Sequence, residues 1–237
     1  MDAKLLMMAA AGVGGGDFYP YTVDNSARFD GTTSDYLNFT PGAGNRKLWT
    51  FSTWYKRCAS TQQDILIAGA DSNNKTQITI ESSNKINFEL VSGGAGAGSR
   101  QTTAVLLDPS SWYHIVCVFD TSNSTAEDRM RVYVNGERIT SFSSNAGAAG
   151  QSSSINPSLN RDGYVNRTQL HTIGTFYDPD YGAAFDLLDG YMAEVNFIDG
   201  TALTADSFGE TKDGIWVPKN VSGLTFGTNG FHLDFAD

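Results

Sequence analysis

The hydrophobic and polar positions between residues 112 and 142 predict a core strand followed by a hairpin. In Trp112–Asp120 both alternating faces are largely apolar, which is typical of a strand covered on both sides in a layered β protein. Met130–Val134 then alternates apolar side chains with Arg131 and Tyr133. The Asn135-Gly136 dipeptide that follows tolerates the positive φ angles of a type I′ turn. We therefore expect a hairpin with the return strand Glu137–Phe142.

Further strand patterns follow at regular spacing, separated by turn residues, and Leu48–Arg57 is the longest of them. The others are Ala27–Phe29, Tyr36–Phe39, Ile65–Ala68, Gln77–Ile80, Lys85–Val91, Ala104–Leu107, Gln169–Gly174, Phe185–Asp186 and Gly190–Ile198. Gly93–Gly98 predicts a flexible hairpin loop, and Asn145–Asn160 predicts a long surface loop. Because no window beyond a short N-terminal stretch keeps an apolar helical period, the pattern predicts an all-β sandwich.

Composition narrows the class of protein. A chain of 237 residues with 40% hydrophobic content suits one large β domain. The formal net charge of −10 would repel nucleic acid, and no stretch approaches the roughly 20 apolar residues of a membrane span, so we expect neither nucleic-acid binding nor membrane insertion. Cys58 and Cys117 both lie in strand-like runs, and we expect two free, buried thiols.

The N-terminal segment 1–25 combines a short apolar run with a glycine string. We interpret it as a docking arm for a partner subunit, with packing on its own domain as the open alternative. A signal peptide is disfavoured because Asp2 accompanies Lys4 and the apolar run is short. The residues expected to dock are Leu5, Leu6, Met7, Met8, Phe18 and Tyr19.

The C-terminal segment 210–237 predicts a strap that packs back on the sandwich. Pro218, in the run Trp216–Pro218, has no amide hydrogen to donate, so this run cannot continue a regular central strand. Phe231, Leu233 and Phe235 alternate as expected of a last strand that faces inward. Packing against a neighbouring subunit is the alternative.

Catalytic patterns are weak in this sequence. Glucanases of layered β folds place acidic residues at i, i+2 and i+4 on one strand, and no glutamate here is followed two residues later by an acid. No Gly-x-Ser-x-Gly elbow and no zinc-ligand spacing occur. His114 is expected to be a packed strand residue, and the chain is expected not to be an enzyme.

The loop Tyr177–Gly190 is the candidate ligand site. Asp178, Asp180, Asp186 and Asp189 offer the hard oxygen ligands that Ca²⁺ prefers, although aspartates in turns also cap their own backbone. Tyr177 and Tyr181 could stack on a sugar ring while Asp178 and Asp180 bind its hydroxyl groups; an exposed tyrosine also commonly marks a protein interface.

Five segments resemble the concanavalin A-like, laminin G-like jelly roll, an antiparallel two-sheet sandwich, in sequence and in order. They are Arg28–Thr40, Leu48–Arg57, Trp112–Asp120, Arg131–Ile139 and Leu187–Glu210. The resemblance covers about residues 26–209 and implies one jelly-roll domain between the arm and the strap.

A narrower resemblance concerns LLMMAAAGVGGG near the N-terminus, NFTPGAGNRKLWTFSTWYKR, and FGTNGFHLDFAD at Phe226–Asp237. These three sequence segments are similar to segments of virion structural proteins of marine tailed bacteriophages, which are often described as tail or tail-fibre proteins. The resemblance implies a non-enzymatic tail-fibre, adaptor or capsid-decoration subunit on the virion surface. Its partners would be other virion proteins, further copies of itself, with a trimer favoured, and host-surface glycans. The alternatives are a free carbohydrate-binding lectin and, less favoured, a glycan hydrolase.

Overall fold

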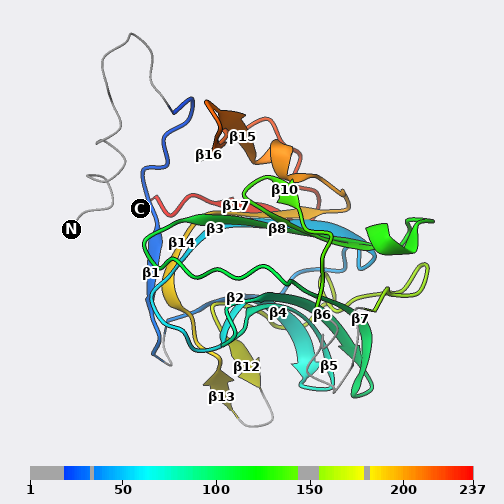
Figure 1. Ribbon diagram of the computed structural model, residues 1–237. Coiled ribbons are helices and arrows are strands. Elements are labelled where there is room, and N and C mark those ends of the chain that lie inside the picture. The colour runs from blue at the N-terminus through cyan, green and yellow to red at the C-terminus, as the bar shows by residue number, and fades with distance from the viewer. Residues whose placement is uncertain (1–18, 33–34, 144–154, 179–181, 237) are drawn as a thin grey trace, which may run out of the picture.

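The computed structural model describes residues 19–32, 35–143, 155–178 and 182–236. Two large antiparallel sheets stack face to face (Figure 1). Helical structure in this part of the chain is limited to two 3₁₀ turns, η1 (Ala126–Asp128) and η2 (Ala205–Ser207). None of the described helical turns has the length or apolar character needed to cross a bilayer. The predicted all-β two-sheet sandwich is confirmed.

Sheet A contains seven strands. Its main path runs through β1 (Ala27–Asp30), β14 (Asp189–Asp199), β3 (Leu48–Arg57), β8 (Tyr113–Asp120), β9 (Met130–Val134) and β10 (Glu137–Arg138). The seventh strand, β17 (Phe231–Leu233), pairs with the second half of β14, whereas β1 pairs with the first half. The C-terminal strand predicted at Phe231 therefore forms, and both ends of the described chain meet β14.

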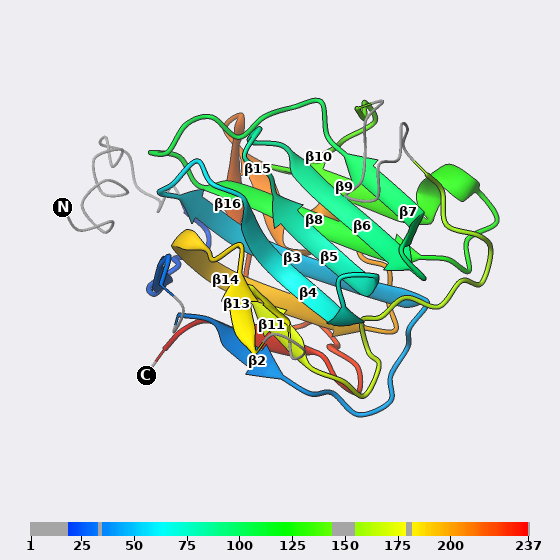
Figure 2. The same ribbon diagram turned by 90° about the horizontal axis from the view of Figure 1, so that it is seen from below.

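Sheet B contains six strands. In order they are β2 (Leu37–Phe39), β11 (His171–Ile173), β4 (Gln63–Asp71), β5 (Asn74–Ile80), β6 (Ile86–Ser92) and β7 (Ala95–Gln101). Two small hairpins complete the fold, β12 (Phe176–Asp178) with β13 (Ala183–Phe185), and β15 (Gly209–Lys212) with β16 (Ile215–Pro218). Figure 2 shows β2 at one edge of the sandwich, and β7 and β10 at the opposite edge. We call these the terminal edge (β1, β2) and the far edge (β7, β10).

The main core lies between the two sheets and is rich in aromatic side chains. Trp49 of sheet A stacks on Phe119 with ring centroids 5.5 Å apart, and meets Phe88 of sheet B edge-on at 5.6 Å. All three side chains are fully buried. Large rings that interlock across the sheets bury apolar area and add favourable edge-on contacts, so this cluster holds the two layers together.

A second apolar layer covers the outer face of sheet A. Val116 and Val118 of β8 point into it and pack against Phe208, which follows η2, and Val221 of the C-terminal segment, whereas Cys117 faces the main core. Strand β8 is thus covered on both sides, as its two apolar faces predicted. The strap lies over this face in Figure 1, with the β15–β16 hairpin above β8.

Several expectations about local structure are wrong. Ala104–Leu107 is not a strand, and the glycine-rich run expected to be a loop instead enters β7 after a turn at Gly93 and Gly94. The return strand after the type I′ turn ends at Arg138. Cys58 is exposed because it directly follows the end of β3, whereas Cys117 is buried, and both thiols are free.

Candidate functional site

The acidic loop predicted to bind a ligand forms the β12–β13 hairpin and the approach to β14. Asp180 and Tyr181 lie outside the described residues. Tyr177 stacks on Tyr36 with ring centroids 6.3 Å apart, so one face of its ring already has an aromatic partner. Asp178 is only 4% exposed. Tyr177 is half-buried and the Asp178 carboxylate lies inward, so the described part of this loop does not place the two side chains together on an open surface.

The remaining two aspartates of this loop have partners outside it. Asp186 accepts a hydrogen bond of 2.7 Å from the Gln62 side chain, and Asp189 forms an ion pair of 2.7 Å with Arg28. Among the described residues, no three His, Cys, Asp or Glu side chains gather closely enough to hold a metal ion. Because Asp180 is not described, the calcium site stays a prediction.

The N-terminal docking residues also stay a prediction. Leu5, Leu6, Met7, Met8 and Phe18 lie outside the described residues, and Tyr19 is half-buried.

The first described residues are held against sheet A by a carboxylate. The Tyr21 hydroxyl donates to Glu194 Oε1 at 3.2 Å, and His232 Nε2 of β17 lies 2.8 Å from Glu194 Oε2. Glu194 has a φ of 48° within the bulge where β14 loses register with β3, which turns its side chain toward both chain ends. Burial and the neighbouring Glu194 raise the pKa of Tyr21 to about 12. Both ends of the described chain are thus fixed near the terminal edge.

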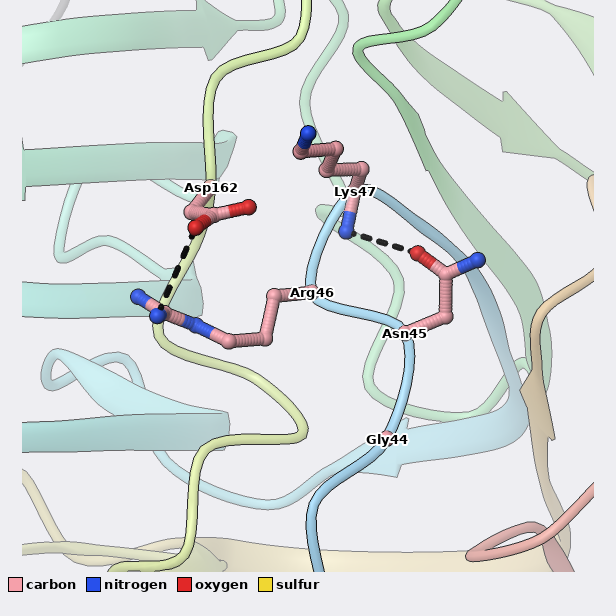
Figure 3. Close-up of a pocket in the computed structure, with 5 residues that line it drawn as sticks. All are labelled: Gly44, Asn45, Arg46, Lys47 and Asp162. Carbon is pink, nitrogen blue, oxygen red and sulfur yellow. Dashed lines mark hydrogen bonds and ion pairs between the residues drawn. The ribbon is translucent and has the colours of Figure 1, made fainter.

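A hollow of about 460 Å³ lies where the chain enters β3. Figure 3 shows the five described residues that line it. We call it the loop pocket, and its lining is Gly44, Asn45, Arg46, Lys47 and Asp162. Arg46 reaches across to Asp162 at 3.5 Å and donates from Nε to the Gly163 carbonyl at 2.9 Å. The hollow is shallow and has no apolar side chain in its lining, so it offers little to a sugar ring.

A buried polar network supports the loop pocket from below. Asp199 Oδ1 accepts hydrogen bonds from the Asn45 backbone amide at 3.0 Å and from Asn166 Nδ2 at 2.8 Å. Its Oδ2 accepts from the Asn229 backbone amide at 3.2 Å. Both carboxylate oxygens therefore bind N–H donors, and Asp199 ties three loops together rather than offering a free metal ligand.

A second pocket, of about 420 Å³, opens at the far edge between β7 of sheet B and the β9–β10 hairpin of sheet A. We call it the edge pocket, and its lining is Arg100, Glu127, Met130, Arg138, Ile139, Thr140, Phe142 and Asn156. The lining contains apolar, charged and amide side chains. They come from η1, from the strands β7, β9 and β10, and from two connecting segments.

The charged groups of the edge pocket are held by hydrogen bonds. Arg100, only 3% exposed, donates from Nη1 to the Ser99 and Ile155 carbonyls at 3.0 and 3.2 Å and from Nη2 to Asn156 Oδ1. Asn156 Nδ2 in turn donates to Glu127 Oε1 at 3.4 Å.

Arg100 and Arg138 are each further fixed by a neighbour. The Arg100 guanidinium lies 5.1 Å from the centroid of the Phe142 ring, and Arg138 pairs with Asp128 outside the pocket lining. Burial lowers the pKa of Arg100, the Glu127 carboxylate opposes that effect, and the charge of Arg138 adds to it. Two guanidinium groups in fixed positions thus share one pocket with one carboxylate.

The outer face of sheet B carries two carboxyl groups that bear on hydrolysis. Asp64 of β4 accepts a 2.5 Å hydrogen bond from the Thr79 hydroxyl, and burial raises its pKa to about 7. Glu89 of β6 is fully buried and accepts from Gln77 Nε2 at 3.1 Å. A glycosidase needs two carboxyl groups that both face the sugar. Neither Asp64 nor Glu89 is accessible in this structure.

Ser52 and His114 lie 2.9 Å apart but do not form a nucleophile and base. The indole N–H of Trp216 donates to His114 Nδ1 at 3.0 Å, and indole nitrogen is only a donor, so the imidazole proton resides on Nε2. His114 Nε2 therefore donates to Ser52 Oγ and cannot accept its proton. His114 is fully buried within β8, which confirms it as a packed strand residue, and this burial lowers its pKa to about 3.

Sequence reasoning missed the edge pocket. Its residues come from separate segments, with Arg100 on the unrecognised strand β7 and Arg138 on the return strand of the hairpin. The one available signal in the sequence was Arg138 followed closely by Ile139 and Phe142.

Comparison with known proteins gives a family match and fold neighbours. The concanavalin A-like lectin/glucanases superfamily matches residues 30–207, and no curated protein matches the chain. The mouse laminin α1 chain domains LG4–5 align with a TM-score of 0.52 and 12% identity, covering 89% of this chain and 49% of that chain. The CBM40 domain of Ruminococcus gnavus IT-sialidase, bound to α2,3-sialyllactose, aligns with a TM-score of 0.50 and 12% identity, covering 73% and 93%. These two structures are similar in fold.

Proposed function

Because the chain belongs to the concanavalin A-like lectin/glucanases superfamily, we propose that it is a lectin-like domain that binds glycans without catalysis and is displayed on a bacteriophage virion. One observation carries this proposal. The edge pocket opens at the far edge, whereas both ends of the described chain are fixed near the terminal edge. A domain held by its ends at one edge presents the opposite edge to the surroundings.

The edge pocket has the chemistry that a sugar ring requires. Ile139 and Phe142 offer apolar surface for the C–H faces of a ring, and the arginine and amide groups offer donors and acceptors for its hydroxyl groups. Its volume of about 420 Å³ lies within the usual range for small-molecule sites. The β12–β13 hairpin with Tyr177 remains a second candidate contact, because Tyr177 and Tyr36 form a stacked aromatic pair there.

The proposed location on the virion rests on the resemblance of the N-terminal and C-terminal sequence segments to phage structural proteins. In this proposal residues 1–25 dock on another virion protein, and copies of the chain assemble as a homo-oligomer, with a trimer favoured. Repeated weak glycan contacts would then add avidity at the host surface.

A non-catalytic role is favoured because neither the two buried carboxyl groups nor the Ser52–His114 pair is arranged for hydrolysis. Asp64 and Glu89 are at most 2% exposed, and the Ser52–His114 pair has its proton directed toward the serine. The calcium site at the acidic loop would be a structural addition to this role and is not needed for it.

Localisation on purified particles tests the proposal against the free-lectin alternative. An antibody to this chain should label heads or tails in electron micrographs, and mass spectrometry should find the chain at a stoichiometric copy number. Particles that lack the chain would contradict the virion role and favour a free lectin. Binding of the full chain to a glycan array, with and without Ca²⁺, tests the lectin part independently.

A further inference from the structure

We infer that the edge pocket selects a saccharide residue that bears a carboxylate or a sulfate group. The inference rests on the proposed glycan binding and names the class of glycan. It comes from the charges that line the pocket, two guanidinium groups and one carboxylate, in a chain whose formal net charge is −10. The charges of the lining itself therefore sum to a positive value, opposite in sign to that of the whole molecule, and Asp128 beside Arg138 lies outside the lining.

The two guanidinium groups are placed in advance. Arg100 is fixed by backbone carbonyls and by the Phe142 ring, and Arg138 is fixed by Asp128. A planar guanidinium matches the two oxygens of a carboxylate or sulfate, and a fixed side chain loses little entropy when the ligand binds. Both features favour an anionic group over an isolated hydroxyl.

Burial strengthens this preference. Arg100 is 3% exposed and already donates to two carbonyls and to Asn156, so it acts on a ligand through its charge, and Arg138 makes the direct contact. A charge at the wall of a partly closed pocket is screened less by water than one on an open surface. The floor formed by Met130, Ile139 and Phe142 excludes further water from beneath a bound ring. An anion at this position therefore gains more than it would beside an exposed arginine.

The loop pocket provides an internal comparison. It also contains an arginine paired with an aspartate, Arg46 with Asp162, and the side-chain exposures of the two arginines are similar, 33% for Arg46 and 38% for Arg138. In the loop pocket, however, the paired carboxylate is part of the lining and no aromatic ring is present. Arg46→Gln is therefore a matched control for Arg138→Gln.

The test uses the full chain on an array of paired glycans, in which each uronate or sulfated oligosaccharide stands beside its methyl-esterified or desulfated counterpart. We expect binding to the acidic members and a marked loss of binding at high salt. Arg138→Gln should weaken that binding about tenfold, the loss expected for one charge-assisted hydrogen bond. Arg46→Gln should leave it unchanged.

Glu127→Gln gives a gain-of-function test. The glutamine keeps an oxygen that can accept from Asn156 but removes a negative charge that faces the ligand. We expect acidic glycans to bind about threefold more tightly to this variant, and neutral glycans to be unaffected. Comparison of the uronate pairs with the sulfated pairs on the array shows whether the pocket prefers a carboxylate or a sulfate group.

Each other outcome overturns a defined claim. Equal binding to both members of a pair, with no effect of Glu127→Gln, would overturn the acidic class but leave glycan binding intact. Binding that Arg138→Gln and Arg46→Gln weaken equally would place the ligand outside the edge pocket. Binding to no glycan at all would overturn the proposed lectin function together with this inference.

Discussion

Asp64 is a carboxyl group in an environment that disfavours its charge. It is 2% exposed, and burial raises its pKa to about 7, well above the value of about 3.9 in an unfolded chain. Between pH 4 and 7 the folded chain retains a proton that the unfolded chain has lost. The free energy of unfolding therefore falls as pH rises through this window, and the cost of the buried charge is fully present above pH 7.

Asp64→Asn should remove this part of the pH dependence. The asparagine carbonyl can still accept from the Thr79 hydroxyl, and no charge is buried at pH 8. We expect the free energy of unfolding at pH 8 to rise by up to about 4 kcal/mol, with little change at pH 4. Urea denaturation at both values measures this.

Asp108→Asn is the control for Asp64→Asn. Hydrogen bonds from Ser110 and Ser111 lower the pKa of Asp108 to about 2, so its titration lies below the pH 4–8 window. In this variant the free energy of unfolding should change with pH between 4 and 8 as it does in the unmodified chain. If the free energy of unfolding of Asp64→Asn kept the same dependence on pH, that dependence could not be assigned to Asp64.

Gly44 is required by the network around Asp199. A Cβ atom at this position would lie 2.3 Å from Asn229 Nδ2 and 2.7 Å from Asp199 Oδ2. Gly44→Ala should therefore separate the loops that these side chains join and lower the free energy of unfolding by about 2 kcal/mol. Gly42→Ala is the control, because the nearest atom to its Cβ would be 3.6 Å away. Equal thermal midpoints for the two variants would argue against a close-packed network.

At the level of elements, strands with a clear alternation could be predicted from the sequence. The predicted bounds of β3 and β9 are those of the structure, and Asn135 and Gly136 adopt the positive φ angles of 48° and 86° that a type I′ turn requires. In these segments local propensity and tertiary packing favour the same conformation.

Strand β7 could not be predicted from local propensity, because close tertiary contacts require glycine at a position where strands usually carry larger residues. Gly98 lies where a Cβ atom would come within 2.7 Å of Met130 Sδ and 3.3 Å of Pro157, so the strand carries glycine despite the low strand propensity of that residue. Conversely, Ala104–Leu107 contains apolar residues with a buried Leu106 but pairs with no strand. Its Leu106 carbonyl instead accepts from Arg57.

Trp216 is one of the residues that attach the β15–β16 hairpin to sheet A. Cβ atoms at Gly136 and Gly209 would come within 2.5 and 2.6 Å of the indole ring, which also stacks on His114. Trp216→Phe should cost about 1 to 2 kcal/mol because His114 Nδ1 loses its donor, and Trp216→Ala should cost about 3 kcal/mol or more. Chemical denaturation gives both values.

The neighbouring Ile215 is the control for Trp216. Its side chain is 54% exposed, so Ile215→Ala should change the free energy of unfolding by less than about 0.5 kcal/mol. Hydrogen exchange should accelerate in residues 209–218 of Trp216→Ala alone. Slow exchange in that variant would show that other contacts hold the hairpin.

At the scale of the whole molecule, the sandwich separates its ends from its edge pocket. Sheet A runs from β1 to β10 and sheet B from β2 to β7, so the terminal and far edges are divided by the full width of the sheets. The order of motifs was sufficient to predict the sandwich. The edge pocket was not predictable, because its lining depends on β7 lying beside the β9–β10 hairpin across two different sheets.

This separation predicts that attachment and glycan binding can be removed independently. Deletion of Met1–Gly16, which lies outside the described residues, should abolish incorporation into particles if the segment docks on a virion protein. It should leave the thermal midpoint and glycan binding of the isolated chain unchanged, because the described lining of the edge pocket lies at the opposite edge from the first described residues. Arg138→Gln should give the opposite result, with normal copy number in particles and weakened binding to acidic glycans. Particle mass spectrometry and glycan binding, measured on both variants, test the arrangement. A deletion that weakens glycan binding as strongly as Arg138→Gln would mean that the two edges do not act separately.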